Sequence, residues 1–213
     1  SKPVTAWVKW KGQPQLVMIV GGGYDAVYDD PSYKSNTNKT KGNGVYIFAA
    51  DSNANTGLTA GDLMWWGSSS ATTTSAGANN SSQKTNNTDL KYSVVSEIKT
   101  VDRDGDGFVD NLYFGDLGGQ LFRVDLNNAA STPASNFNVK RIVRIGNFVE
   151  DSARSTKAAP RFYAKPTFTV HRLNSMEGIR NATRYAVISI GSGDQSSPVY
   201  NKLTQTTGEP DRV

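Results

Sequence analysis

The chain has 213 residues, with 23 Lys and Arg against 19 Asp and Glu, a formal net charge of +4, and no cysteine. Without cysteine, disulfides, thiol catalysis and cysteine-bound zinc are all excluded. The basic residues are scattered, which argues against a nucleic-acid groove, and no apolar run approaches the ~20 residues that a membrane-spanning helix needs.

Three short apolar runs, each followed by glycine and aspartate, recur along the chain. They are QLVMIVGGGYD (15–25), DNLYFGDLGG (110–119) and RYAVISIGSGD (184–194). Apolar runs of this length that end in glycine-rich turns are typical of buried β-strands. The chain also has 20 glycines and few strong helix formers, and this composition indicates an all-β protein.

Further strands are expected after the first two runs. GNGVYIFAAD (42–51) and GGQLFRVDLN (118–127) place glycine before alternating large apolar residues, and GDLMWWG (61–67) and FNVKRIVRI (137–145) then supply a third strand. A unit of three or four short strands that recurs every few tens of residues predicts the blades of a β-propeller. A β-sandwich is the rival architecture.

We therefore expect residues 1–213 to form a single β-propeller region of roughly three to four blades, which is part of a larger propeller. One stretch within it, 67–89, consists almost entirely of Ser, Thr, Asn, Ala and Gly. Such a segment has little apolar surface to bury, so we expect a mobile loop there.

The stretch VDRDGDGFVDNLYFGD (101–116) concentrates aspartates just before a predicted strand. Like charges this close repel one another, and a hard divalent cation relieves the repulsion. A calcium loop supplies oxygen ligands from alternate positions and turns sharply at a glycine in position 6, which is Gly107 here. The predicted ligands of Ca2+ are the carboxylates of Asp102, Asp104, Asp106 and Asp110 and the backbone carbonyl of Phe108.

The loop differs from an EF-hand at its end and on its flanks. Position 12 is Tyr113 instead of a bidentate glutamate, and VVSEIKTV (94–101) and NLYFG (111–115) are expected to be strands instead of helices. We therefore expect a calcium loop that Asp110 closes early, between two strands. A weaker echo of this aspartate spacing, DSNANTGLTAGD (51–62), has Asp or Asn at several of the same positions but lacks the glycine at position 6. We interpret it as a turn held by Asx hydrogen bonds.

Few other residues are of a type that could act in catalysis. His171 is the only histidine, so a histidine-based triad or a multi-histidine metal site is not expected, and we assign His171 a structural role on a strand. Trp65 and Trp66 suit either a sugar-stacking platform or packing between blades, and we favour packing.

Several of these motifs together resemble the C-terminal β-propeller of the PilY/PilC family, the type IV pilus-associated adhesins and biogenesis factors. The residues that carry the resemblance are IVGGGYD, GNGVYIFAAD, GDLMWW, VDRDGDGFVDNLYFGDLGGQLFRVDL and ISIGSGD, within about 16–213. The resemblance implies that the loop binds calcium through the five residues named above. It further implies that the metal influences the balance of pilus extension and retraction, and so twitching motility.

The same resemblance implies a place and a set of partners. It points to a non-enzymatic, exported protein at the bacterial cell surface, in the outer membrane or at the pilus tip. There it would support pilus biogenesis and surface adhesion. Its partners would be other type IV pilus components, the minor pilins, and a host or abiotic surface, and not nucleic acid.

Two other propeller classes remain alternatives. Quinoprotein dehydrogenases have blade strands similar to GVYIFAAD and GDLMWW and also use calcium, but their calcium lies beside a quinone and is held by separated residues. Integrin-like ligand-binding propellers repeat an Asp-rich calcium loop in several blades, whereas this sequence has one strong example.

Overall fold

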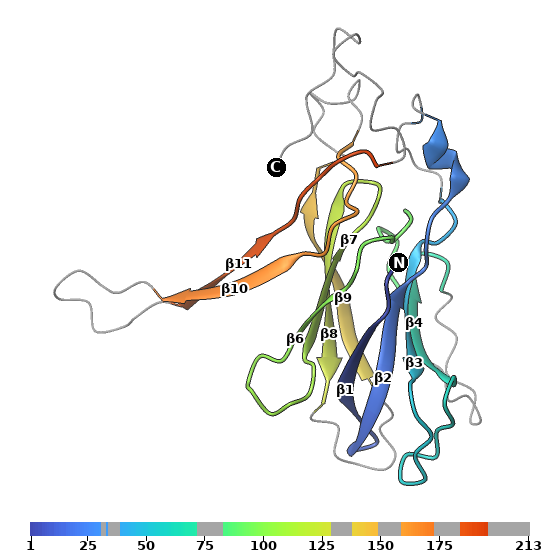
Figure 1. Cartoon of the computed structure of the whole chain (residues 1–213), viewed down its shortest axis with the longest axis vertical. Helices are drawn as coiled ribbons and strands as arrows, with labels where there is room; N and C mark the ends of the chain where they lie inside the picture. Colours follow the sequence, from blue (N-terminus) through green and yellow to red (C-terminus); the bar gives the residue numbers. More distant parts are fainter. Residues whose placement is uncertain are drawn as a thin grey trace, which may run out of the picture.

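The computed structural model describes residues 1–30, 33, 39–71, 83–128, 138–148, 159–172 and 184–195. Within this part, the chain forms three β-sheets and one short 3-10 helix, η1 (Ala26–Asp29). The predicted all-β class is therefore confirmed. Figure 1 shows the strands of the two larger sheets running along the long axis of the molecule. None of the helices described is long and apolar enough to cross a membrane.

The first sheet contains five strands in chain order, β1-β2-β3-β4-β5. Neighbouring strands are antiparallel, except that β5 runs parallel to β4. The predicted strands in the first third of the chain correspond to β2, β3 and β4, whereas β1 and β5 were not predicted. The strands are β1 (Val4–Trp10), β2 (Gln13–Gly21), β3 (Gly44–Ala49), β4 (Leu63–Ser68) and β5 (Gln83–Asn86).

The second sheet is an antiparallel meander of four strands in the order β6-β7-β8-β9. A tight turn over residues 116–119 joins β7 to β8, as predicted. The strand expected at 94–101 is shorter than predicted, because only its last three residues pair with β7. The strands are β6 (Lys99–Val101), β7 (Asn111–Gly115), β8 (Gln120–Asn127) and β9 (Asn138–Asn147).

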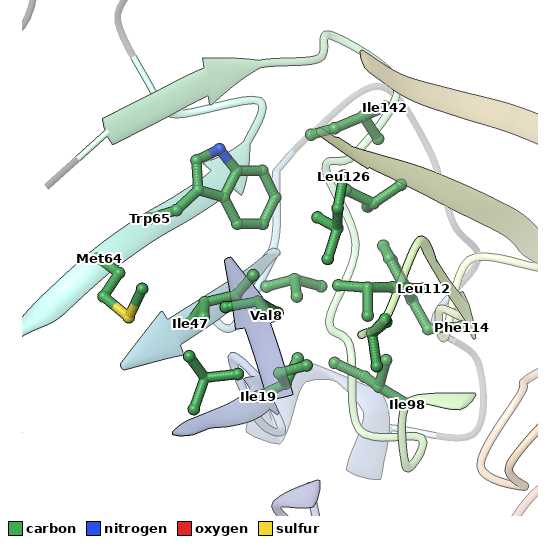
Figure 2. Packing of buried hydrophobic residues seen from close by; sticks show 14 of the residues in the cluster. Val8, Ile19, Ile47, Met64, Trp65, Ile98, Leu112, Phe114, Leu126 and Ile142 are labelled. Carbon is green, nitrogen blue, oxygen red and sulfur yellow. The ribbon is translucent and has the colours of Figure 1, made fainter. Parts of the chain in front are cut away.

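These two sheets pack face to face through one hydrophobic core. Buried residues alternate with half-buried ones along β2 and β3, so one face of the first sheet points at the second sheet. Figure 2 shows Ile47 and Trp65 of the first sheet facing Leu112 and Leu126 of the second. Each large side chain buried in this way contributes about 1.5–3 kcal/mol to stability.

Every residue of β7 is buried, on both faces of its sheet. On the face away from the core, the ring of Phe168 stacks on the ring of Tyr113, with 5.3 Å between centroids. On the same face, Phe162 lies against Gly115 so closely that an added Cβ would be 2.5 Å from the Cβ of Phe162. Burial on both faces explains why NLYFG is a continuous apolar run instead of an alternating one.

The first sheet is also apolar on the face that points away from the core. Tyr46 and Phe48 of β3 lie there, and the ring of Tyr46 is nearly parallel to that of Trp66, 6.0 Å away. Trp65 points into the core and is 1% exposed, so it packs between the sheets as predicted. Strands that are apolar on both faces are typical of stacked sheets. Two sheets stacked in this way fit both a propeller and a sandwich, so the β-propeller stays a prediction.

The third sheet is a two-stranded antiparallel hairpin formed by β10 (Thr167–Arg172) and β11 (Arg184–Ser189). The strand predicted within 184–194 is present as β11, but the prediction that it is buried was wrong, since β11 is mainly exposed. It pairs only with β10, and no other described strand covers it. His171 lies on β10 as predicted, and its exposed ring stacks on Tyr185 with 5.4 Å between centroids.

Part of the segment at 67–89, predicted to be a mobile loop, forms β5 instead. The indole Nε1 of Trp65 donates a hydrogen bond to the hydroxyl of Thr85 at 3.0 Å. The sequence of this polar segment shows no strand pattern. This hydrogen bond and the parallel pairing with β4 hold it in an extended conformation as a strand. Residues 72–82 of that segment lie outside the described part of the chain.

Candidate functional site

The aspartate-rich loop lies between β6 and β7, as predicted. Its two ends meet where the N–H of Asp110 donates to the carbonyl of Val101 at 2.9 Å. The N–H of Val109 donates to the carbonyl of Trp7, also at 2.9 Å. Because Trp7 belongs to β1, both large sheets hold the base of the loop.

The loop brings together Asp102, Asp104 and Asp106. Each offers a carboxylate oxygen, and these oxygens lie within 4.8 Å of one another at the exposed surface. Calcium binds oxygen at 2.3–2.6 Å, so a single ion can bridge oxygens that are up to about 5 Å apart. The three carboxylates are therefore close enough to share one ion.

Hydrogen bonds from the loop backbone orient these carboxylates. The two oxygens of Asp102 accept the N–H groups of Gly105 at 2.7 Å and Gly107 at 2.8 Å. Gly105 and Gly107 have φ angles of +83° and +88°. These are left-handed conformations, which glycine adopts without steric cost. The sequence analysis identified the role of Gly107 but not that of Gly105.

Asp106 has a cationic neighbour that sequence reasoning missed. Its carboxylate accepts the N–H of Phe108 at 2.9 Å and the ammonium of Lys9 at 3.2 Å. The bond from Phe108, and then the contact with Lys9, hold the pKa of Asp106 below its usual value. The ammonium of Lys9 also lies 4.6 Å from the centroid of the Phe108 ring. Lys9 is thus an internal counter-charge from the first sheet.

Asp110 lies outside the group of three carboxylates. One of its oxygens accepts the N–H of Arg103 at 2.8 Å, and the other is 3.5 Å from the amide nitrogen of Asn128. Phe108 takes part in the loop through its N–H and its ring, as described above. The coordination of calcium by the three grouped carboxylates, by Asp110 and by the carbonyl of Phe108 stays a prediction.

Asn128 is, after Lys9, the second residue near the loop that no local sequence pattern predicted. Its side-chain nitrogen donates to the carbonyl of Val109 at 2.7 Å, and its side-chain oxygen accepts the backbone N–H of Lys9 at 3.1 Å. Asn128 therefore joins the end of the loop to β1. It fixes the position of Lys9 relative to the carboxylates.

The donor atoms fit calcium chemically. The group consists of oxygen atoms from three acidic side chains, and it faces solvent. Calcium takes six to eight oxygens, so water and the further predicted ligands would complete its shell. Magnesium requires a smaller octahedral cage and retains its own waters, which makes it a poorer match.

The weaker echo at 51–62 is an Asx turn, as we interpreted it. The side-chain oxygen of Asn53 accepts the N–H of Asn55 at 3.0 Å. The carboxylate of Asp62 accepts the N–H of Thr59 at 2.8 Å. These side chains are thus engaged with the turn's own backbone.

Asp116 is a buried carboxylate at the other end of β7. Its oxygens accept the N–H of Gly118 at 3.0 Å, the N–H of Gln120 at 2.8 Å and the side-chain amide of Gln120 at 2.8 Å. Burial raises the pKa of Asp116 to about 7, although these donors lower it. The side-chain oxygen of Gln120 accepts a bond from Arg144 at 2.9 Å, so the turn is also tied to β9.

The aspartates that follow the other two apolar runs are structural as well. Asp25 caps η1 by accepting the N–H of Val27 at 3.2 Å. Asp194 accepts a bond from Arg161 at 2.9 Å, and Arg161 also donates to the carbonyl of Tyr28 at 2.8 Å. The signal for these roles was the recurrence of aspartate after each glycine-rich turn, which sequence analysis noted without interpreting it.

Comparison with known proteins adds one structural likeness. No family model and no curated protein matches this chain. A similar solved structure is the C-terminal domain of PilY1 from Pseudomonas aeruginosa, with 17% sequence identity and a TM-score of 0.32. The likeness covers 93% of this chain and 49% of that one, so this chain spans about half the length of the solved domain. We therefore base the functional proposal on motifs and site geometry.

Proposed function

We propose that this chain is a calcium-binding β-propeller region of a type IV pilus-associated adhesin and that it acts without catalysis. The observation that carries the proposal is the gathering of Asp102, Asp104 and Asp106 within 4.8 Å at the surface. The loop that holds them is closed by β6 and β7 and anchored to β1. A preformed loop of this kind binds a cation with little loss of backbone freedom.

A bound calcium ion would neutralise the carboxylates and be coordinated by their oxygens, and the loop would hold these oxygens in place. In the structure, the ammonium of Lys9 contacts one oxygen of Asp106. It offsets part of the repulsion among the three carboxylates. A divalent cation offsets more, because it contacts several oxygens at once. We propose that calcium displaces Lys9 from Asp106 when it binds.

The pilus-related part of the proposal rests on the sequence motifs. The calcium loop continues directly into LYFGDLGGQLFRVDL, the most specific stretch of the resemblance to the PilY/PilC family. On this basis, the domain would support pilus biogenesis and surface adhesion. Calcium occupancy of the loop would control extension and retraction of the pilus, and hence twitching motility.

Isothermal titration and thermal unfolding test calcium binding. We expect saturable binding of Ca2+ and weaker binding of Mg2+, with a Tm that rises with calcium. A ligand at about 100 times its Kd stabilises the folded state by about 2.7 kcal/mol. Replacing Asp102, Asp104 and Asp106 together by Asn should abolish both effects.

The matched control is Asp62→Asn, which removes a carboxylate from a hydrogen-bonded turn elsewhere. This variant should bind calcium like the unchanged chain. Calcium binding that survives the triple change, or that Asp62→Asn also removes, would overturn the metal assignment.

The pilus role needs a cellular test in the bacterium that encodes the chain. The triple change, introduced into the full-length protein, should alter twitching motility and the number of surface pili while leaving the level of the protein unchanged. Normal motility and piliation in a strain whose purified protein no longer binds calcium would refute the control function.

A further inference from the structure

Lys9 reaches the aspartate loop from the other large sheet. Its ammonium lies 3.2 Å from a carboxylate oxygen of Asp106 and 4.6 Å from the centroid of the Phe108 ring. Among the residues that the structure describes, Lys9 is the cation that forms an ion pair with one of the three grouped carboxylates. The loop is thus partly neutralised by a residue that lies 97 positions away from Asp106 in the sequence.

The main chain fixes the position of Lys9 beside the loop. The backbone N–H of Lys9 donates to the side-chain oxygen of Asn128 at 3.1 Å. Two residues earlier on the same strand, the carbonyl of Trp7 accepts the N–H of Val109 at 2.9 Å. Because β1 is already held against the base of the loop, the ion pair forms without ordering any further main chain.

The ion pair between Lys9 and Asp106 is only partly exposed to solvent. The side chain of Lys9 is 31% exposed and that of Asp106 is 38% exposed. The face of an aromatic ring attracts an ammonium at the distance seen for Phe108. Salt and water screen partly buried charges less than fully exposed ones. The attraction between Lys9 and Asp106 is therefore stronger than that of a fully exposed pair.

A metal ion that enters the loop has to compete with this ammonium. The oxygens that the loop offers to a cation include those of Asp106, and one of these faces Lys9. Two cations at one carboxylate repel each other. For unit charges about 4 Å apart, this repulsion changes an affinity by about fivefold even in bulk water. Lys9 therefore opposes the binding of a further cation.

We propose, on the basis of the calcium site proposed above, that Lys9 is a tethered counter-ion that sets the calcium concentration at which the loop fills. When calcium is absent, the ammonium offsets part of the repulsion among the three grouped carboxylates. When calcium binds, the ammonium leaves Asp106. The loop therefore fills at a higher calcium concentration than its carboxylates alone would require.

Isothermal titration of Ca2+ into the whole chain and into Lys9→Met tests the proposal. Methionine keeps an unbranched apolar side chain beside Phe108 and removes the charge. We expect Lys9→Met to bind calcium at least about fivefold more tightly than the unchanged chain, because the competing cation is gone. An equal or weaker affinity in Lys9→Met would overturn the proposal.

The matched control is Lys84→Met. The ammonium of Lys84 also lies over an aromatic ring, 5.9 Å from the centroid of Trp66, but on β5 at the opposite edge of the first sheet. This variant changes the net charge by the same amount and should leave the calcium affinity unchanged. If Lys84→Met tightens binding as much as Lys9→Met does, the effect is one of net charge and the role of Lys9 is refuted.

A double-mutant cycle tests whether Lys9 acts through Asp106. Asp106→Asn should weaken calcium binding, because it removes one of the grouped carboxylates. Lys9→Met added to Asp106→Asn should then tighten binding by less than it does in the unchanged chain. Equal tightening in both backgrounds would show that Lys9 does not compete for Asp106, and it would overturn the proposal.

The outcome for the calcium site itself is distinguishable from the outcome for Lys9. If neither the unchanged chain nor Lys9→Met binds Ca2+, the calcium site is refuted, and the role of Lys9 with it. If both bind Ca2+ with the same affinity, the calcium site stands and the role of Lys9 alone is refuted.

Discussion

Arg161 and Asp194 form a buried ion pair, with 2.9 Å between Nη1 and Oδ1 and both side chains 8% exposed. The guanidinium also donates to the carbonyl of Tyr28, and its carbon lies 5.2 Å from the centroid of the Tyr28 ring. The pair joins the segment before β10 to the one that follows β11, and the bond from Arg161 to Tyr28 adds η1, which follows β2. Three parts of the chain that are distant in sequence are thus held at one point.

Arg161→Ala should therefore destabilise the fold by about 3–5 kcal/mol, because it removes one partner of a buried ion pair. Urea unfolding measures the loss. The matched control is Lys165→Ala, which breaks the exposed ion pair with Glu97 and should have little effect, as exposed pairs usually do. Similar losses in the two variants would contradict the role of burial.

The stability of the fold should depend on pH through Asp116. Its pKa of about 7 lies above its ordinary value of 3.8, so the folded state holds the proton more tightly than the unfolded state. The stability linked to this proton is fully present below about pH 4 and is lost as the pH rises to 7. A shift of about three units corresponds to about 4 kcal/mol at most.

Asp116→Asn, whose side chain stays neutral, provides the comparison. Urea unfolding at several pH values should show the unchanged chain losing stability relative to this variant between pH 4 and pH 8. A constant difference across that range would mean that Asp116 is an ordinary carboxylate in the folded state.

Gly115→Ala should destabilise the fold by about 1–3 kcal/mol through overpacking. The new Cβ would lie 2.5 Å from the Cβ of Phe162 and 2.8 Å from Cδ1 of Ile190. Gly191→Ala adds the same methyl group where no atom lies within 4 Å, and it should be nearly neutral. Thermal unfolding of both variants checks the prediction, which fails if they melt together.

Leu112→Ala should cost about 2–5 kcal/mol, since Leu112 is 0% exposed between the two sheets. Ile145→Ala removes an aliphatic side chain that is 38% exposed on β9 and should cost much less. Denaturant unfolding distinguishes the two. An equal loss would show that the shared core is not the main source of stability.

The features that sequence predicted correctly are those with local causes. The turn after β7 follows from Asp116 and the two glycines near it, and the grouping of Asp102, Asp104 and Asp106 in one loop follows from their alternate spacing. Both patterns lie within a few residues, so the backbone geometry that they require is visible in the sequence.

The features that sequence missed depend on residues far apart in the chain. Lys9 and Asn128 meet at the aspartate loop because β1 passes its base, and no periodic pattern marks such a meeting. The exposure of β11 was missed for a related reason. RYAVIS has the composition of a buried strand, and burial depends on whether another layer covers it.

The anchoring of the aspartate loop to β1 has a consequence for the order in which the molecule is assembled. Trp7 and Lys9 leave the ribosome long before Val109 and Asn128, their hydrogen-bond partners. Contacts between such distant segments form late in folding. The loop is thus complete only after the two large sheets have met. An excised peptide with the same aspartates lacks that support, so tight calcium binding would report that the two large sheets have packed together.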